Sequence, residues 1–102
     1  MAQFDVFANR RSRDFPLLLD VQADLLSDLA TRIVVPLMPR KRFGGKPITR
    51  LNPTAVLGGV EYVAVFQELA AIPRAALGSP VHSLKARRAE FVAALDLLFT
   101  GS

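Results

Sequence analysis

The residues of this chain that could perform acid–base or metal chemistry are few. His82 is the single histidine and there is no cysteine, which excludes thiol nucleophiles, disulfides, cysteine-bound metals and multi-histidine metal sites. Asp20 and Asp24 place two carboxylates near the end of a predicted strand, but no histidine is nearby to complete a metal site. Gly44-Gly45 and Gly58-Gly59 do not lead into a helix with Lys-Ser/Thr, as a phosphate loop requires. We therefore expect a protein without enzymatic activity, bound metal or cofactor.

Positive charge is the chemical feature that gathers in this sequence. The net charge is +4, and the cations cluster in segments rich in loop-forming residues. Such clusters suit an anionic partner, either nucleic acid or an acidic protein segment, and ordinary solvated surface charge is the alternative. The candidate partner-binding cations are Arg10, Arg11 and Arg13 in a first predicted loop and Arg40, Lys41 and Arg42 in a second.

Length and composition indicate one domain that spans residues 1–102. Hydrophobic residues make up 51% of the 102 residues, which is enough for one ordered core. No apolar run approaches the roughly 18 residues that a membrane-spanning helix needs, and the first residues lack the pattern of a signal peptide. We expect a cytoplasmic protein with no membrane partner.

Alternating apolar, β-branched and aromatic residues predict strands along most of the chain, followed by one helix. Gly58-Gly59 predicts a tight hairpin turn that needs positive φ angles. The elements expected between the helix and the N-terminus are strands at 3–8, 15–22, 31–37, 48–57 and 60–67, a short helical turn or loop at 23–30, a long loop at 39–47, a last strand piece in 68–73 and a connection at 74–80. Strands first and a helix last favour a mainly β fold, an antiparallel sheet or small open barrel capped by that helix.

The segment 83–102 is predicted to be the capping helix. Ser83 is suited to be its N-cap, and Gly101 can adopt the positive φ that ends a helix. At about 100° per residue, most of the large apolar side chains fall on one wide face that should dock on the sheet. This face holds Leu84, Phe91, Val92, Ala94, Leu95, Leu98 and Phe99, while the back of the helix, with Ala89, Ala93 and Leu97, is more apolar than solvent contact requires and indicates a binding surface.

Five segments, in order, resemble toxins of the CcdB type. Residues 19–26, Leu-Asp-Val-Gln-Ala-Asp-Leu-Leu, are similar to that family's Val-Asp-Val-Gln-Ser-Asp-Ile-Ile, and residues 32–37, Arg-Ile-Val-Val-Pro-Leu, to its Arg-Met-Val-Ile-Pro-Leu. The segments 3–7, 69–73 and 97–102 also fall at the expected spacing. The resemblance covers the whole chain and implies a partly open, SH3-like β-barrel with a C-terminal helix.

The same resemblance implies a homodimeric toxin of a toxin–antitoxin module that is not an enzyme. The family's toxin wedges into the dimerisation region of the gyrase A subunit and traps gyrase on cleaved DNA, without direct nucleic-acid binding. A disordered segment of a CcdA-like antitoxin wraps the toxin dimer and neutralises it. Because the helix ends of the family's dimer meet near its two-fold axis, Leu98 and Phe99 are the predicted dimer interface, and the two basic loops are the candidate antitoxin site.

The positions that face gyrase in the family are only partly retained. Leu25, Leu26 and Gly101 keep the family's character. Thr100 and Ser102 replace the family's Trp and terminal Ile, which predicts weak or absent poisoning of a gyrase suited to a Trp-bearing toxin. The remaining changed positions lie on the predicted helix: Arg88, Ala89, Val92, Ala93 and Asp96.

Two other functions compete with this hypothesis. A ribonuclease toxin of the MazF type shares the SH3-like architecture and would use the positive charge to contact RNA phosphates, although the strand motifs match CcdB better. The second alternative is a protein that binds antitoxin but whose gyrase target is altered or lost. Thr100 and Ser102 favour this alternative.

Overall fold

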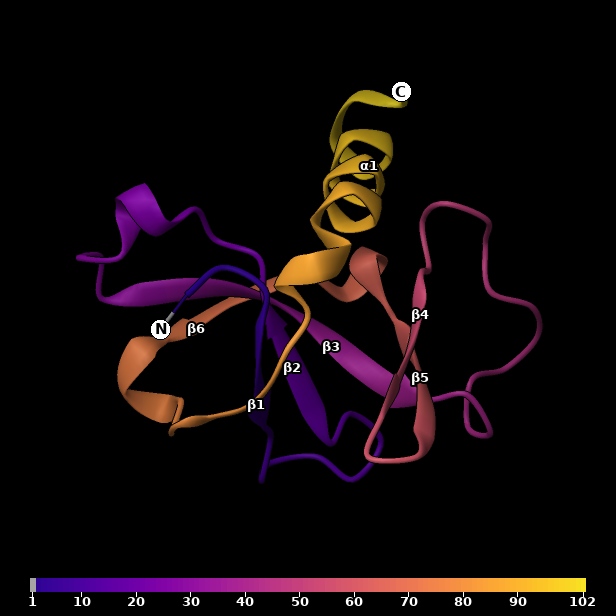
Figure 1. The fold of residues 1–102 in the computed structure, drawn as a ribbon, viewed down its shortest axis with the longest axis horizontal. Helices are drawn as coiled ribbons and strands as arrows, with labels where there is room; N and C mark the ends of the chain where they lie inside the picture. Colours follow the sequence, from indigo (N-terminus) through magenta and orange to yellow (C-terminus); the bar gives the residue numbers. More distant parts are fainter. Residues whose placement is uncertain (1) are drawn as a thin grey trace.

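Short segments rich in apolar residues form one strongly curled antiparallel sheet, from which a single α-helix projects (Figure 1). The computed structural model describes residues 2–102. Its elements are β1 (Asp5–Ala8), β2 (Leu17–Asp20), β3 (Thr31–Pro39), β4 (Thr54–Leu57), β5 (Val60–Ala64), β6 (Ala70–Pro73), β7 (Pro80–Ser83) and α1 (Arg88–Thr100). The mainly β architecture with one C-terminal helix confirms the predicted fold class.

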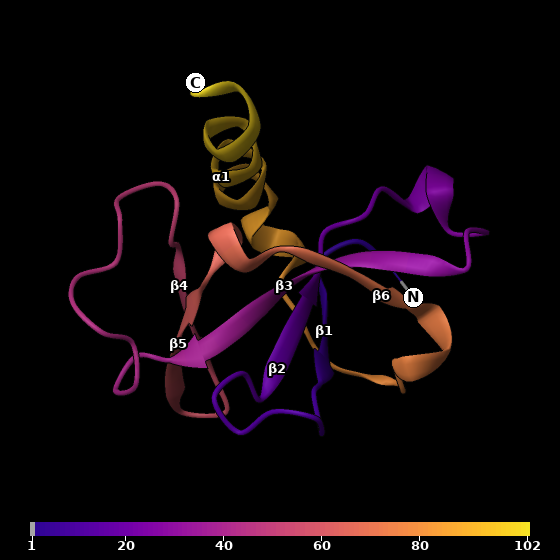
Figure 2. The same cartoon turned by 180° about the vertical axis from the view of Figure 1, so that it is seen from behind.

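The long strand β3 organises the sheet. The strand order is β4-β5-β3-β2-β1-β7, and β6 also pairs with β3. Thr31 to Val34 of β3 pair with β6, Val34 to Leu37 pair with β2, and Leu37 to Pro39 pair with β5. One strand therefore serves three partners in succession, which curls the sheet into a half-barrel that is open between β6 and β7 (Figures 1 and 2).

The two faces of this sheet bury different clusters. On the face that we call the helix-covered face, strand residues such as Val6, Leu19 and Val35 pack with Leu84, Phe91 and Ala94 from the C-terminal segment. On the other face, Phe7, Leu18, Val34 and Leu77 form a smaller cluster, with Ile72 packed against it. We call this second side the loop-covered face, because Leu77 comes from the connection between β6 and β7.

The hairpin between β4 and β5 confirms the turn that was predicted from sequence. Gly58 and Gly59 separate the two strands with φ angles of 58° and 80°. Both values lie in the left-handed region that a two-residue hairpin of this kind requires. The preceding strand is shorter than predicted, because residues 48–53 form a turn instead of a strand. The buried side chain of Asn52 holds this turn: it accepts a hydrogen bond from the Ile48 N–H at 3.0 Å and donates to the Ala64 carbonyl at 3.1 Å.

The predicted start of the helix is wrong. Ser83 is the last residue of β7, where it pairs with Asp5 of β1, and the Leu84 N–H donates to the Phe4 carbonyl at 2.8 Å. A 3-10 turn, Lys85–Arg87, follows before α1 begins at Arg88. Pairing with β1 supplies ladder hydrogen bonds that an N-cap could not. The predicted end is confirmed, because Gly101 has a φ of 76° and its N–H donates to the Leu97 carbonyl at 3.1 Å.

The helix stands away from the sheet instead of lying along it (Figure 1). Within α1 only Phe91 and Ala94 are fully buried, and the Phe91 ring packs against Phe4 and Phe66 at centroid distances of 5.4 and 6.3 Å. The predicted face is therefore fully buried only at Phe91 and Ala94, while Val92, Leu95 and Leu98 are partly buried against the core and Phe99 is exposed. Within residues 2–102, no helix is long and apolar enough to cross a membrane.

Candidate functional site: two projecting segments, a basic cluster and a pocket

An exposed apolar turn follows β2. The 3-10 turn Asp24–Leu26 presents Leu25, whose side chain is 94% exposed, and Leu26, which is 47% exposed. Exposing a large aliphatic side chain this fully forgoes about 1.5–3 kcal/mol that its burial would contribute. Such an exposed pair of large aliphatic side chains on one turn, which we call the leucine knob, is the kind of apolar surface that can mark a protein-interaction site.

A buried polar network holds this turn in place. The Gln22 side chain donates from Nε2 to the Leu26 carbonyl at 3.0 Å and accepts at Oε1 from the Ile33 N–H at 3.1 Å. Behind it, the Asp20 carboxylate accepts from Arg32 at 2.9 Å from Nε and 2.6 Å from Nη2. Both side chains of this ion pair are fully buried. The turn is therefore connected to the interior of the sheet, so that the leucine knob is presented by a fixed support.

Sequence reasoning considered Asp20 only as part of an incomplete metal site and missed this ion pair. The signal was present, because Asp20 and Arg32 are single opposite charges within two apolar strand sequences. The buried Asp20 carboxylate is already paired with Arg32. The described part of the chain holds no group of three side chains that could bind a metal ion. His82 lies in β7, opposite Val6 of β1.

Gln3 links the apolar turn to the helix. Its N–H donates to Asp24 Oδ1 at 2.7 Å, and its Oε1 accepts from Arg88 Nη1 at 2.7 Å. The Arg88 guanidinium also lies over the Phe4 ring, 5.9 Å from the centroid. The turn and α1 project from the same side of the sheet in both ribbon views (Figures 1 and 2). No local pattern predicts this role of Gln3, because Asp24 and Arg88 are distant from it along the chain.

α1 and the two residues after it carry the remaining residues expected from the family resemblance. Phe99 is 68% exposed, and Leu98 is half-buried. Of the positions proposed to face a target, some point fully into solvent and others are half-buried: Arg88, Ala89, Asp96, Thr100, Gly101 and Ser102 are exposed, whereas Val92 and Ala93 are half-buried.

The polar groups of the C-terminal tail are bonded within the chain. Thr100 Oγ1 donates to the Asp96 carbonyl at 2.7 Å and lies 2.9 Å from the Ser102 hydroxyl. Arg50, from the turn before β4, donates to the Ser102 carbonyl oxygen at 2.6 Å. These contacts hold the C-terminal tail toward the body of the protein. At Thr100 and Ser102 a partner would meet polar atoms instead of a large apolar side chain.

The two predicted basic loops lie together in the structure. Arg42 of the second loop pairs with Asp14 at the end of the first loop, with 2.9 Å between Nη1 and Oδ1. Arg10, Arg11 and Arg13 in the first loop and Lys41 in the second are exposed, and Arg40 is half-buried. The ion pair is itself exposed and worth about 1 kcal/mol or less, so its importance is geometric. It joins the two clusters into one basic surface.

A third ion pair lies at the start of α1. Arg87 donates to both carboxylate oxygens of Glu90, at 3.1 and 2.5 Å. These hydrogen bonds lower the pKa of the Glu90 carboxyl below its ordinary value. Arg87 also lies over the Phe91 ring, 5.8 Å from its centroid, so the pair covers the edge of the aromatic cluster.

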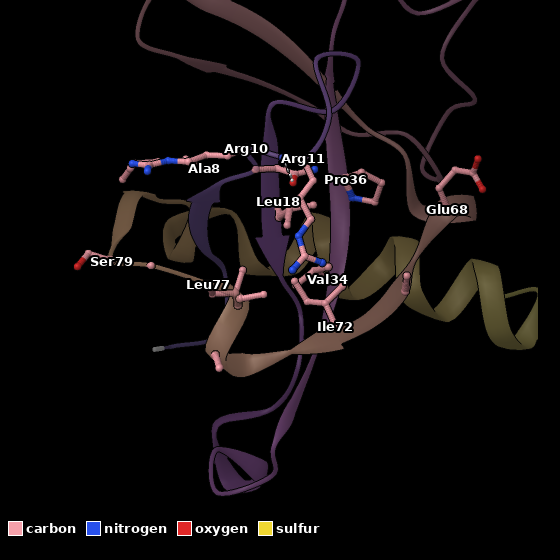
Figure 3. A pocket seen from close by; sticks show the side chains of 16 residues that line it. Ala8, Arg10, Arg11, Leu18, Val34, Pro36, Glu68, Ile72, Leu77 and Ser79 are labelled. Carbon is pink, nitrogen blue, oxygen red and sulfur yellow. Dashed lines mark hydrogen bonds between the residues drawn. The ribbon is translucent and has the colours of Figure 1, made fainter.

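A pocket of about 770 Å³ opens on the loop-covered face, between β6 and β7 (Figure 3). Its floor is formed by Leu18 and Val34, and Leu77 closes one end. Arg10 and Arg11 lie on its rim, and Glu68 lies across from them. Sequence reasoning did not predict this pocket, which forms only where strands far apart along the chain leave the barrel open.

Comparison with known protein families gives a match that spans nearly the whole chain. The family described as CcdB protein matches residues 3–101. All five segments that carried the sequence resemblance fall within this range, apart from the final residue.

Proposed function

The chain belongs to the CcdB family and is thus a toxin of a toxin–antitoxin system, and we propose that it acts by binding the A subunit of DNA gyrase. The observation that carries this proposal is the Leu25 knob, which is 94% exposed although a buried network fixes the turn that bears it. A turn whose backbone is already ordered loses little chain entropy on docking, so its apolar side chain can anchor a partner efficiently. In this proposal the protein works in the cytoplasm by binding alone and catalyses no reaction.

We propose that the toxin is a homodimer joined through the outer half of α1. Phe99 is exposed and Leu98 is only half-buried, because the helix projects beyond the core of its own chain. A second copy related by a two-fold axis would cover both side chains with the same patch of its own surface. Sedimentation at micromolar concentration should give about twice the mass of 11.1 kDa, and Leu98→Asp should weaken association by placing a charge in a desolvated contact. A monomer at all concentrations would contradict this proposal.

We propose that a CcdA-like antitoxin binds the joined basic surface through a disordered, acidic segment. The contact between Arg42 and Asp14 places the cations of both loops within reach of one extended chain. Charge-assisted hydrogen bonds would offset part of the entropy that the segment loses on ordering. Calorimetry with the protein encoded immediately upstream should show binding that weakens as salt rises. If that protein does not bind at low salt, the antitoxin assignment is wrong.

A specific observation favours a second candidate, a toxin whose gyrase target is altered or lost. Thr100 and Ser102 are bonded to Asp96, to each other and to Arg50, so the tail offers polar atoms that are already satisfied. A Trp at such a position typically supplies about 2 kcal/mol or more of interface energy, which threonine cannot replace.

A cleavage-complex assay separates these candidates. Gyrase from the host and from a distant bacterium is incubated with the wild type, Thr100→Trp, and Leu25→Asp, and trapped cleaved DNA is measured. Trapping by the wild type that Leu25→Asp abolishes supports gyrase binding through the leucine knob. Trapping by Thr100→Trp alone indicates an eroded gyrase site, and no trapping by any variant supports a different target. Cleavage of single-stranded RNA by the wild type would support the ribonuclease alternative.

A further inference from the structure

We propose that the pocket between β6 and β7 binds a peptide segment in which a carboxylate side chain stands next to large aliphatic or aromatic side chains. The inference rests on the proposed antitoxin contact and deepens it, because it adds an apolar anchor to what the basic loops would otherwise hold by charge alone.

The walls of the pocket supply the apolar part of this recognition. The floor residues Leu18, Val34 and Leu77 are 9%, 2% and 8% exposed, so they are almost fully covered by their own neighbours. The accessible apolar surface belongs to the exposed Ala70, the half-buried Ile72 and Val81, which is 49% exposed. The volume of about 770 Å³ lies within the range of about 300–1,000 Å³ that is typical of ligand pockets. It is large enough for more than one side chain of a partner.

The rim of the pocket supplies the charge. Arg10 and Arg11 are both exposed, and the ion pairs of residues 2–102 employ other arginines: Arg32, Arg42 and Arg87. In Figure 3 the Arg11 side chain reaches across the pocket toward Val34 and Ile72. A guanidinium in that position can donate two parallel hydrogen bonds to a carboxylate whose neighbouring side chain enters the pocket.

The loop that carries these arginines has a defined shape. The Asn9 side chain donates to the Phe15 carbonyl at 2.9 Å and accepts from the Arg11 N–H at 3.2 Å. Asn9 thereby closes the loop at its base, beside the pocket. The cations are therefore presented at the rim by a braced loop, which lowers the entropy that binding would cost.

The chemistry of the lining favours a peptide over a nucleic acid. Single-stranded nucleic acid is held by bases stacked on aromatic rings, and the described residues that line this pocket include no aromatic side chain. Glu68 lies on the rim opposite Arg10 and Arg11 with its carboxylate turned outward, where its negative charge would repel a phosphate backbone. The opposite charges across the pocket also give a bound peptide a preferred direction, with its carboxylate at the arginine side.

The experiment is an NMR titration of the isotope-labelled, full-length protein with acetyl-Glu-Asp-Leu-Phe-Asp-Ile-amide. We expect shifts of the methyl signals of Leu18, Val34, Ile72 and Leu77 that saturate, and a lower affinity at high salt. Two control peptides separate the two parts of the recognition. One carries the corresponding amides in place of the carboxylates, and the other carries serine in place of the apolar residues. Both should bind more weakly, and equal binding of either would overturn the proposal.

Two pairs of variants locate the site. Arg11→Glu should weaken binding of the acidic peptide about fivefold or more, whereas Arg13→Glu, which changes the same loop charge outside the pocket, should have a smaller effect. Ala70→Trp fills the pocket and should abolish the methyl shifts. Ala71→Trp is the matched control, because adjacent strand residues point to opposite faces and only Ala70 lines the pocket. Shifts that map elsewhere, or that survive Ala70→Trp, would overturn the proposal.

Failure of this inference can be told apart from failure of the proposed function. If the upstream-encoded protein binds Ala70→Trp and Ala71→Trp equally well, the antitoxin contact stands and the pocket proposal is wrong. If that protein fails to bind the wild type while the acidic peptide still occupies the pocket, the pocket proposal stands and the antitoxin assignment is wrong.

Discussion

The two faces of the sheet are completed to different extents. On the helix-covered face, Phe91 closes an aromatic cluster with Phe4 and Phe66. The loop-covered face has no α-helix over it in residues 2–102, and Leu77 from a connecting segment covers part of a smaller cluster. What remains open there is the pocket with its arginine rim (Figure 3).

This difference separates stability from binding. A closed aromatic cluster removes apolar area from water within the chain itself, and that burial is the main favourable contribution to folding. The apolar walls of the pocket, at the half-buried Ile72 and the exposed Val81, leave part of the same free energy for a partner to gain. The face that stabilises the fold least is thus the face best suited to recognition.

The largest effect is expected on the helix-covered face. Phe91 is 1% exposed and contacts two other rings, so Phe91→Ala should lower the free energy of unfolding by about 4 kcal/mol through lost transfer energy and a residual cavity. Urea denaturation measures this change. The control is Val56→Ala on β4, a residue 67% exposed, which should change stability by less than about 0.5 kcal/mol. Equal losses in both variants would contradict the idea that this cluster closes the core.

The next largest loss of stability is expected at the buried ion pair between Asp20 and Arg32. Both residues lie on the loop-covered face, because alternate residues of a strand share a face and each lies two positions from Leu18 or Val34. Arg32→Met leaves the Asp20 carboxylate buried without its cation and should cost about 3 kcal/mol at neutral pH. Burial already raises the pKa of the Asp20 carboxyl above its ordinary value of 3.8, while hydrogen bonds from Arg32 and the Gln22 N–H oppose the rise. Without Arg32 the pKa of this carboxyl should rise further.

The raised pKa of Asp20 sets the sign of the pH dependence of stability in Arg32→Met. A carboxyl whose pKa is raised in the folded state binds a proton there more tightly than in the unfolded chain, so stability falls as pH rises from the ordinary pKa through the raised one. Arg32→Met should therefore be closest to the wild type in acid and least stable near neutrality. Urea titrations of both proteins across this range measure the difference, and a deficit that is constant with pH would contradict the account.

A smaller loss is expected where the loop-covered face is already open. Leu77 is 8% exposed and borders the pocket, so Leu77→Ala should lower the free energy of unfolding by about 2 kcal/mol, at the lower end of the range for buried leucines. The same variant enlarges the pocket and should weaken binding of the acidic peptide. A loss of stability as large as that of Phe91→Ala would contradict the idea that the loop-covered face stabilises the fold less than the helix-covered face.

The smallest loss of stability is expected at the ion pair between Arg87 and Glu90 at the start of α1. Arg87→Ala should cost about 0.5 kcal/mol, because both side chains are partly exposed and solvent screens their attraction. The lowered pKa of Glu90 means that this contribution is complete above the ordinary pKa of 4.5 and is lost as pH falls through the lowered value. Thermal unfolding of wild type and variant at neutral and acidic pH tests this, with Lys85→Ala as a control of the same charge change.

Local sequence patterns by themselves determined several elements of the fold. The two glycines at 58–59 predict their hairpin because a two-residue turn needs positive φ, and Gly101 ends α1 for the same reason. The apolar alternation predicts most strands, and the match of segment order predicts the family. Signals of this kind depend on residues that are neighbours along the chain, so no tertiary information is needed to recognise them.

Other features were decided only by tertiary structure. Ser83 has the residue type of an N-cap, but β1 lies beside it and the pairing with Asp5 makes it the end of β7. Arg42 meets Asp14, and Gln3 joins Asp24 to Arg88, only because the curled sheet brings together segments that lie far apart along the chain. The pocket exists because β6 pairs with β3 while β7 pairs with β1, which leaves the barrel open between them. Strand register and closure depend on the pairing of distant segments, and composition and local periodicity do not specify that pairing.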